Sequence, residues 1–283
     1  MDKVLQDLSP PALVRAIEAS MLDLYRNYGR SPLAELDDRP DLLRLTTGVP
    51  VPVFNAVVWA RFTTRDADER IAAALAPFRE RRVAALWWIG PSSEPPDLGA
   101  RLQRHGLTPA GDEPGMAADL ATLPEPPPLP RGVAIEPAAD ERALARWVWA
   151  FSLGFGIPES LAGFHLELER SLGVDPHGRW RRYLAVADGE PAAVSAALLG
   201  AGVVGLYDVA TRPQHRRRGL GTALTLQPLL EARALGYRAA VLQASPEGER
   251  LYRRLGFREY CRVYQYLWSP RRQARTATPD EEA

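Results

Sequence analysis

The segment from Tyr207 to Thr222 (YDVATRPQHRRRGLGT) holds the residues whose types and spacing point most directly to chemistry. A strand-like run leads into it, and a helix-like run follows from Gly219 to Leu235. Glycines at such a turn let the backbone approach a ligand closely, and the start of the helix presents N–H groups with partial positive charge. The arginines add charge-assisted donors. A turn of this kind suits a pyrophosphate group.

Two better-known phosphate motifs do not fit this turn. The lysine and following hydroxyl of the Walker loop are absent, and Gly219-Leu-Gly221 lacks the third glycine of the dinucleotide fingerprint. A bare GxG with arginines also fits a solvated basic turn, so this alternative stays open on the turn alone. The chain as a whole carries 35 basic and 35 acidic residues, so its net charge does not attract nucleic acid or anionic membrane.

The elements around this turn follow from hydrophobic periodicity and from Gly and Pro positions. In the second half, helices are predicted over 140–153, 158–172, 219–235 and 247–255, and strands over 183–187, 192–199, 205–210, 237–243 and 260–268. In the first half, helices are predicted over 12–28, 66–81 and 97–105, and strands over 51–62, 83–90 and 115–120. Asp188-Gly189 predicts a tight hairpin. Pro228 lies inside a predicted helix and is expected to kink it.

A Pro-rich run from Leu123 to Gly132 predicts a stiff linker between two units, because proline disfavours helices and central strands. The sequence therefore suggests an N-terminal domain over 1–122, a linker over 123–132, a second domain over 133–268 and a disordered tail over 269–283. A strand, a helix and a strand close both halves in the same order (AALWWIG, LGARLQRHGL, GMAADL and AAVLQAS, GERLYRRLGF, VYQYLW). This similarity indicates an internal duplication.

Two segments resemble the GNAT N-acetyltransferase superfamily. Arg216-x-x-Gly219-x-Gly221 matches the family's R/Q-x-x-G-x-G/A signature, and Leu251–Phe257 (LYRRLGF) resembles its LYxxLGF segment. The resemblance covers about Arg131 to Trp268. It implies an α/β (α+β) fold with two GNAT-like domains, each a mixed, mostly antiparallel sheet flanked by helices. The N-terminal domain resembles a degenerate, non-catalytic copy, because it has no counterpart of the glycine signature and Leu102 falls where Tyr252 stands.

The resemblance also implies a cofactor site. Acetyl-CoA, as a co-substrate, would lie in a V-shaped gap between the strand through Val209 and the strand through Leu242. The backbone of Val209, Ala210 and Thr211 would hold the pantetheine and the acyl carbonyl. The pyrophosphate would be bound by Arg216, Arg217, Arg218, Gly219, Leu220, Gly221 and Thr222. Ser245 stands where relatives often have Asn, so it keeps a hydroxyl but lacks the usual amide.

For proton transfer, Tyr252 matches the tyrosine that serves the family as general acid toward the leaving thiolate. A phenol also has a pKa comparable to that of a thiol, which suits this transfer. The base is less defined. Asp208 lies where relatives often place a carboxylate, although strand alternation can turn it away from the acceptor. Glu167 and Glu169 are further candidates, and a water chain or a neutral amine would make a base unnecessary.

The resemblance implies transfer of an acetyl or short acyl group from a CoA thioester, and the expected acceptor is a primary amine of a small molecule. A CoA-binding sensor or scaffold, and a protein N-terminal or lysine acetyltransferase, are the alternatives. No metal site is expected from four scattered histidines and the single Cys261. No nucleic-acid or membrane partner is expected, and the cytoplasm is the expected location. The sequence leaves the acceptor and the oligomeric state open.

Overall fold

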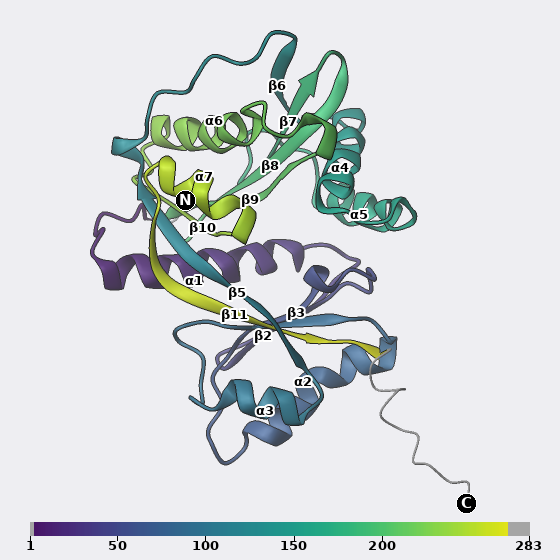
Figure 1. The fold of residues 1–283 in the computed structure, drawn as a ribbon. Coiled ribbons are helices and arrows are strands. Elements are labelled where there is room, and N and C mark those ends of the chain that lie inside the picture. The colour runs from purple at the N-terminus through teal and green to yellow at the C-terminus, as the bar shows by residue number, and fades with distance from the viewer. Residues whose placement is uncertain (1–2, 271–283) are drawn as a thin grey trace, which may run out of the picture. The chain divides into compact units, whose positions relative to one another are not determined.

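The computed structural model describes residues 3–270, which contain helices and strands in mixed order (Figure 1). The described residues group into two compact units. The larger unit comprises residues 3–31 and 113–262, and the smaller unit comprises residues 32–112 and 263–270. The expected mixed α/β fold class is confirmed. The predicted tail lies outside the described residues from residue 271 onward.

The larger unit is built on a mostly antiparallel sheet. Its strands are β6 (Val133–Pro137), β7 (Trp180–Ala187), β8 (Glu190–Gly200), β9 (Val203–Thr211), β10 (Ala239–Gln243) and the second part of β5 (Thr108–Asp119). β6 to β9 pair antiparallel in chain order, β10 pairs parallel with β9, and β5 pairs antiparallel with β10. Asp188 and Gly189 both have positive φ (51° and 86°), so the predicted β7–β8 hairpin turn is confirmed.

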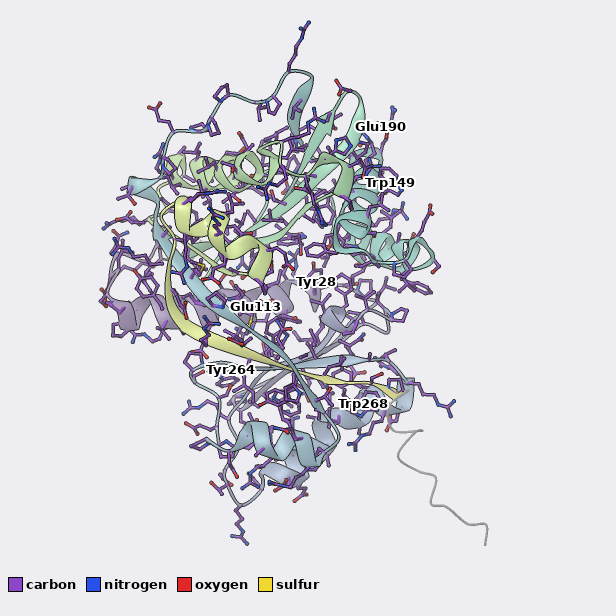
Figure 2. All side chains as sticks on the ribbon, in the orientation of Figure 1. Tyr28, Glu113, Trp149, Glu190, Tyr264 and Trp268 are labelled. Atoms are coloured by element: carbon purple, nitrogen blue, oxygen red, sulfur yellow. The ribbon has the colours of Figure 1, made fainter. Side chains whose placement is uncertain are left out.

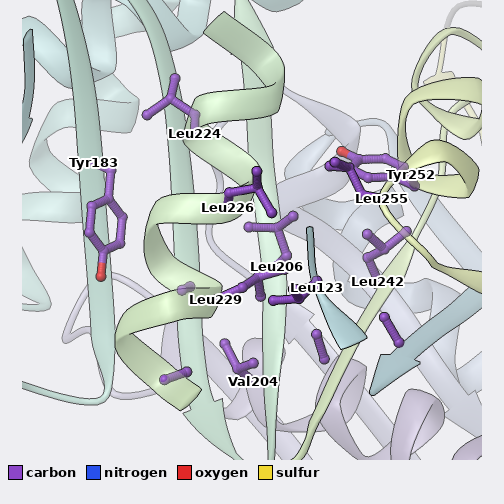
Figure 3. Packing of buried hydrophobic residues seen from close by; sticks show 14 of the residues in the cluster. Leu123, Tyr183, Val204, Leu206, Leu224, Leu226, Leu229, Leu242, Tyr252 and Leu255 are labelled. Carbon is purple, nitrogen blue, oxygen red and sulfur yellow. The ribbon is translucent and has the colours of Figure 1, made fainter. Parts of the chain in front are cut away.

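Helices cover the two faces of this sheet. The α6 face carries inward side chains such as Tyr183, Leu206 and Leu242, which share one core with α6 (Leu220–Ala234) and α7 (Pro246–Arg254) (Figure 3). The opposite face packs against α1 (Pro10–Tyr28), α4 (Glu141–Phe155) and α5 (Glu159–Ser171). Successive strand residues alternate between these faces. The face of the sheet therefore determines which helices a side chain can meet.

The smaller unit repeats the order of the larger one. β1 (Glu35–Arg39), β2 (Leu42–Thr46) and β3 (Asn55–Ala60) pair antiparallel, and β4 (Ala85–Ile89) pairs parallel with β3. The last part of β11 (Arg258–Trp268) pairs antiparallel with β4. Its core includes α2 (Ala67–Arg81) and α3 (Leu98–Arg104). One parallel pair between antiparallel neighbours thus occurs in both units.

The compact units differ from the sequential halves because the last strands are exchanged. β5 ends the first half of the chain but pairs with β10 of the second half, whereas β11 ends the second half but pairs with β4 of the first. α1 also packs within the larger unit, although it begins the chain. Compact units and duplicated copies need not coincide, so the boundaries 1–122, 123–132 and 133–268 stay a prediction.

The predicted elements agree with the structure in most places, with two main differences. The hairpin β1–β2 and strand β6 were not expected: β1 (ELDDR) is highly charged, and β2 (LLRLT) and β6 (VAIEP) are only five residues long. The strand expected from Val51 begins only at Asn55, after a short 3₁₀ turn (η1, Pro52–Phe54). Helix α6 contains Pro228, as predicted, and this proline is buried; the kink stays a prediction.

Candidate active site

The two strands at the centre of the larger unit separate before they end. β9 and β10 pair only at Val204–Ala240 and Gly205–Val241, yet β9 continues to Thr211 and β10 to Gln243. The backbone of β9 from residue 206 onward therefore has no partner strand on its β10 side. Val209, Ala210 and Thr211, the residues predicted to hold the pantetheine, lie in this unpaired stretch.

The turn between β9 and α6 is open at its glycines. Gly219 has φ 82° and precedes α6, and a Cβ atom placed on it would meet nothing within 4 Å. A Cβ on Gly221 would meet only Leu251 Cδ2, at 3.3 Å. Among the described residues, the backbone N–H groups of 217–222 donate to no protein acceptor. The turn thus presents free amides at a helix N-terminus, as a pyrophosphate requires.

The arginines of this turn have different roles. Arg212 is buried, donates from Nη1 to the Pro191 carbonyl (2.5 Å) and stacks its guanidinium 4.2 Å from the Trp149 ring centroid. Arg216 donates to the carbonyls of Thr211 (3.1 Å) and Gly154 (3.3 Å). Both side chains therefore shape the loop through the protein's own carbonyls.

Two further arginines extend from the loop. Arg217 has a left-handed backbone, with φ 64°, and is exposed. Arg218 Nη1 lies 3.3 Å from His215 Nδ1. Burial and the charges of Arg212 and Arg218 lower the pKa of His215, which keeps its ring neutral. These two arginines supply the positive charge beside the free amides.

Helix α7 brings Tyr252 to the same core as the separating strands. Tyr252 is buried with Leu206 of β9 and Leu242 of β10, and its hydroxyl oxygen is directed away from α7 (Figure 3). Burial, helped by the charge of Glu113, raises the pKa of Tyr252 well above its usual value, so the phenol keeps its proton. Ser245 is the N-cap of α7, where its hydroxyl accepts from the Gly248 amide (3.2 Å). The cap leaves the Ser245 O–H proton for another acceptor.

A β-bulge in β9 decides where Asp208 points. Val194 pairs with Ala210 and Ala196 with Tyr207, so Ser195 alone lies opposite Asp208 and Val209. Asp208 has φ 57°, a left-handed conformation that is rare for a residue with a side chain. Regular alternation would send Asp208 to the α6 face. The bulge instead places its carboxylate among the charged groups of α5 and β7.

One oxygen of the Asp208 carboxylate is shielded from solvent and has no hydrogen-bond partner among the described residues. The residue as a whole is partly exposed, but Oδ2 is inaccessible to solvent and has no hydrogen-bond partner among the described residues. Burial, followed by the nearby charge of Glu169, raises the pKa of Asp208 to about 8, against a smaller opposing effect of Arg182. A carboxylate that holds its proton this strongly is suited to proton transfer near neutral pH.

Glu169 belongs to a different kind of arrangement. Its side chain is fully buried, and its carboxylate accepts from Arg182 Nε (2.6 Å), Trp180 Nε1 (3.2 Å) and the Tyr28 hydroxyl (3.1 Å). Burial alone would raise the pKa of Glu169, but Arg182 and hydrogen bonds from His165 and Trp180 outweigh it and lower the pKa to about 2. Glu169 is therefore a poor proton acceptor.

Glu167, the other glutamate considered as a base, lies on the exposed side of α5. Its carboxylate pairs with Arg170 on the same helix. Tyr28, Trp180 and Arg182 were not expected at the site. Figure 2 marks Tyr28 at the end of α1. In the sequence, the position of Arg182 inside the mostly apolar strand β7 could have indicated a buried ion pair.

Helix α4 lies against the same stretch of β9. A Cβ atom on Gly154 would lie 2.7 Å from the Cβ of Ala210, so glycine permits the contact. An aromatic row follows α4, with Trp147 stacked on Phe151 (5.4 Å between centroids) and Phe151 next to the exposed Phe155 (4.7 Å). α4 thus carries aromatic side chains from the core to the surface beside the unpaired strand.

Residues 3–270 contain no group of three or more His, Cys, Asp or Glu side chains arranged to hold a metal ion. None of the helices in that range is both long and apolar enough to span a bilayer.

Comparisons with known proteins agree with this geometry. Residues 179–259 match the family model described as an acetyltransferase (GNAT) domain. A mycothiol acetyltransferase from Actinosynnema mirum is 32% identical over 167 residues, which cover 53% of this chain and 53% of that protein. The chain thus spans about half the length of this curated relative.

Solved structures show the same fold over most of the chain. A GCN5-related N-acetyltransferase from Kribbella flavida has a TM-score of 0.62 and 20% identity, over 89% of this chain and 94% of that one. A tandem GNAT protein from the clavulanic acid biosynthesis pathway has a TM-score of 0.55 and 16% identity, over 99% and 98% of the two chains. The expected resemblance is confirmed. Residues 179–259 match a GNAT acetyltransferase domain, in a chain whose fold is similar to that of a tandem GNAT protein.

Proposed function

We propose that this protein transfers an acetyl group from acetyl-CoA to a primary amine of a small molecule. The separation of β9 from β10, directly before a turn with free amides, carries the proposal. An extended pantetheine can use the unpaired backbone of 209–211, and a pyrophosphate can use the N–H groups of 217–222 together with Arg217 and Arg218. Gly219 and Gly221 leave room for this approach.

The residues beside this stretch can supply the proton transfers. Asp208 accepts a proton from the ammonium group of the acceptor, which gives the nitrogen a free lone pair. The nitrogen then bonds to the acyl carbon while backbone N–H groups of β9 stabilise the negative charge on the acyl oxygen. Tyr252 gives its phenolic proton to the sulfur as the carbon–sulfur bond breaks. The nitrogen loses its second proton to solvent as the amide forms. The products are an amide and the free CoA thiol, and solvent returns a proton to Tyr252.

A small acceptor is favoured over a protein by two observations. The name of the curated relative, mycothiol acetyltransferase, refers to a single compound. In this chain the Asp208 carboxylate is shielded at Oδ2 and reached from a stretch of β9 that α4 covers through Gly154. A carboxylate oxygen that is shielded in this way suits a small amine better than a protein surface.

Two measurements on the full chain test the proposal. Acetyl-CoA at a hundred times its dissociation constant is expected to stabilise the protein by about 2.7 kcal/mol in a thermal-shift experiment. A thiol-release assay then compares phenethylamine, glucosamine and spermidine with a peptide that offers a free N-terminus and a lysine. Thiol release with at least one small amine, and none with the peptide, is the expected result.

The alternatives give different patterns. Stabilisation by acetyl-CoA without thiol release for any amine would favour a CoA-binding sensor. Release with the peptide alone would favour a protein acetyltransferase. The absence of any acetyl-CoA effect would remove the proposal altogether.

A further inference from the structure

A buried ion pair connects α5 to β7 behind the catalytic carboxylate. Arg182 Nε donates to Glu169 Oε2 at 2.6 Å, and each side chain is nearly inaccessible to solvent. The other two guanidinium nitrogens are also engaged. Nη2 donates to the Glu169 carbonyl (3.3 Å), and Nη1 donates to the carbonyl of Gly173, just after α5 (3.1 Å). Arg182 is thus held to α5 by all three of its nitrogens.

Asp208 lies within the electrostatic reach of this pair but takes no part in it. Glu169 and Arg182 are the two charged groups that shift its pKa, and the pKa of Tyr28 in turn responds to both Asp208 and Glu169. Nevertheless no described side chain donates a hydrogen bond to Asp208 Oδ2. Arg182, the cation that acts on Asp208, is engaged with Glu169 and Gly173, and a shielded carboxylate oxygen of Asp208 is left without a partner.

We propose that Glu169 is a positioning residue for the acceptor: it holds Arg182 on α5 and so keeps the Asp208 carboxylate free to receive the acceptor's ammonium group. The inference rests on the proposed acetyl transfer to an amine. It assigns the Glu169–Arg182 pair a role beyond joining two elements. An arginine allowed to turn toward Asp208 would occupy the oxygen that the substrate needs.

The groups around Asp208 show which charge is released when the Glu169–Arg182 pair is broken. The groups that interact electrostatically with Asp208 are Glu169 from α5, Arg182 from β7, Tyr28 from α1 and the neighbouring Tyr207 on β9. His165 of α5 lies beside Glu169, with Nε2 3.5 Å from Oε1. Tyr207 is held by Ser20 of α1 (2.8 Å). Of these, Arg182 alone is a permanent cation. Removal of the Glu169 charge therefore leaves one positive group close to an unpaired carboxylate, and the two are expected to pair.

Three variants separate positioning from simple stabilisation. Glu169→Gln removes the charge that holds Arg182. Glu167→Gln is the matched control, because it changes the same residue type on the exposed side of the same helix. The double variant Glu169→Gln with Arg182→Met removes both charges, and it also covers the case in which Glu169→Gln fails to fold, since replacing both members of a buried pair is often tolerated.

The expected result is a rescue. With phenethylamine as the acceptor probe, or with whichever small amine the thiol-release assay turns over, Glu169→Gln raises the acceptor KM about tenfold or more. The KM for acetyl-CoA stays unchanged. The acidic limb of the rate profile moves down by about one pH unit, because Arg182 then stabilises the charged form of Asp208. The double variant restores the acceptor KM to within about threefold of the parent chain, and Glu167→Gln changes neither quantity.

A purely structural role predicts another pattern, in which the double variant is no better than Glu169→Gln and the acidic limb does not move. Either observation would overturn the proposal. A ¹³C titration of the Asp208 carboxyl carbon in the parent and Glu169→Gln proteins gives a readout without turnover. The Asp208 pKa is expected to fall in Glu169→Gln. An unchanged titration refutes the positioning role even if acetyl transfer is established, whereas a shifted titration without thiol release refutes the proposed function alone.

Discussion

The hydroxyl of Ser195 in β8 donates to the backbone carbonyl of Leu224 in α6 at 2.9 Å. Leu224 is four residues before Pro228, whose missing N–H would otherwise bond to this carbonyl. Ser195 also lies opposite the β9 bulge, and its backbone carbonyl accepts a hydrogen bond from Trp147 Nε1 of α4 (3.1 Å). Ser195 therefore supplies a donor in place of the N–H that Pro228 lacks. It links β8 to α6 on one face of the sheet and to α4 on the other.

This relationship predicts a stability coupling. Ser195→Ala is expected to destabilise the protein by about 1–2 kcal/mol, because the buried Leu224 carbonyl loses its only added donor. Pro228→Ala restores the backbone N–H. In that background, Ser195→Ala should cost about 1 kcal/mol less, which a double-mutant cycle in urea can measure. Equal costs in the two backgrounds would show that the hydroxyl does not serve this carbonyl.

A substitution at Gly221 tests whether the turn between β9 and α6 binds acetyl-CoA. Gly221→Val places a branched side chain over the free amides and against Leu251, so the thermal shift with acetyl-CoA is expected to disappear. Gly163→Val in α5 is the control, because a Cβ there meets nothing within 4 Å, and it should keep the shift of about 2.7 kcal/mol. Retention of the full shift in Gly221→Val would place the diphosphate elsewhere.

Tyr252 tests the proton donor. Tyr252→Phe keeps the ring that packs edge-on against Phe257 (5.8 Å) but removes the phenolic proton. We expect kcat to fall about a hundredfold while acetyl-CoA binding, followed by thermal shift, stays intact. Tyr183→Phe is the control, since it also removes a buried hydroxyl, one that donates to Glu231 at 2.6 Å on the α6 face. If the two variants lose equal activity, Tyr252 is not the acid.

A substitution of Asp208 tests whether this residue is the base, and it is expected to change the stability of the protein in a pH-dependent way. The folded pKa of Asp208 is raised to about 8 from an ordinary 3.8, so the folded state holds this proton more tightly than the unfolded chain does. Stability from this group is complete below pH 3.8 and is lost progressively as pH rises to 8. Asp208→Asn should therefore be more stable than the parent at pH 9, by about 1–3 kcal/mol after allowance for partial exposure, and about equal to it near pH 4.

The same variant is expected to lower kcat/KM about a hundredfold. Denaturant unfolding at pH 4 and pH 9 and the thiol-release assay provide the two readouts. A stability difference that does not grow with pH would mean that Asp208 is not held protonated in the fold. Unchanged activity would leave the proton to a water chain, the alternative that the sequence left open.

The backbone of the turn proposed to bind the cofactor could be predicted from the sequence, because its signals are local. Gly219, Gly236 and Gly256 have positive φ at the ends of elements where glycine was expected to lie. The catalytic side chains were harder. The bulge that turns Asp208 depends on the register between β8 and β9, which local sequence does not specify. The Glu169–Arg182 pair joins two elements whose mutual position is a property of the whole larger unit.

The exchange of β5 and β11 escapes sequence reasoning for a related reason. An apolar strand sequence can pair in either of two sheets of the same design, so pattern alone assigns it to the nearer one. The hairpin β1–β2 was missed because its first strand, ELDDR, shows no apolar alternation and lies largely exposed, although the second strand, LLRLT, is buried throughout. The sequence therefore indicated which of these segments form strands, but it did not indicate which strands pair with each other.

The early end of the β9–β10 ladder has a consequence for the dynamics of the empty protein. A sheet that stops pairing in its interior has an internal edge, and amides on such an edge exchange hydrogen with water unless something else bonds to them. Deuterium uptake at those amides of 207–210 that point away from β8 should then be fast in the protein alone and slow once acetyl-CoA is added. On this view the thioester acts as a temporary strand, and each catalytic cycle completes the sheet and opens it again.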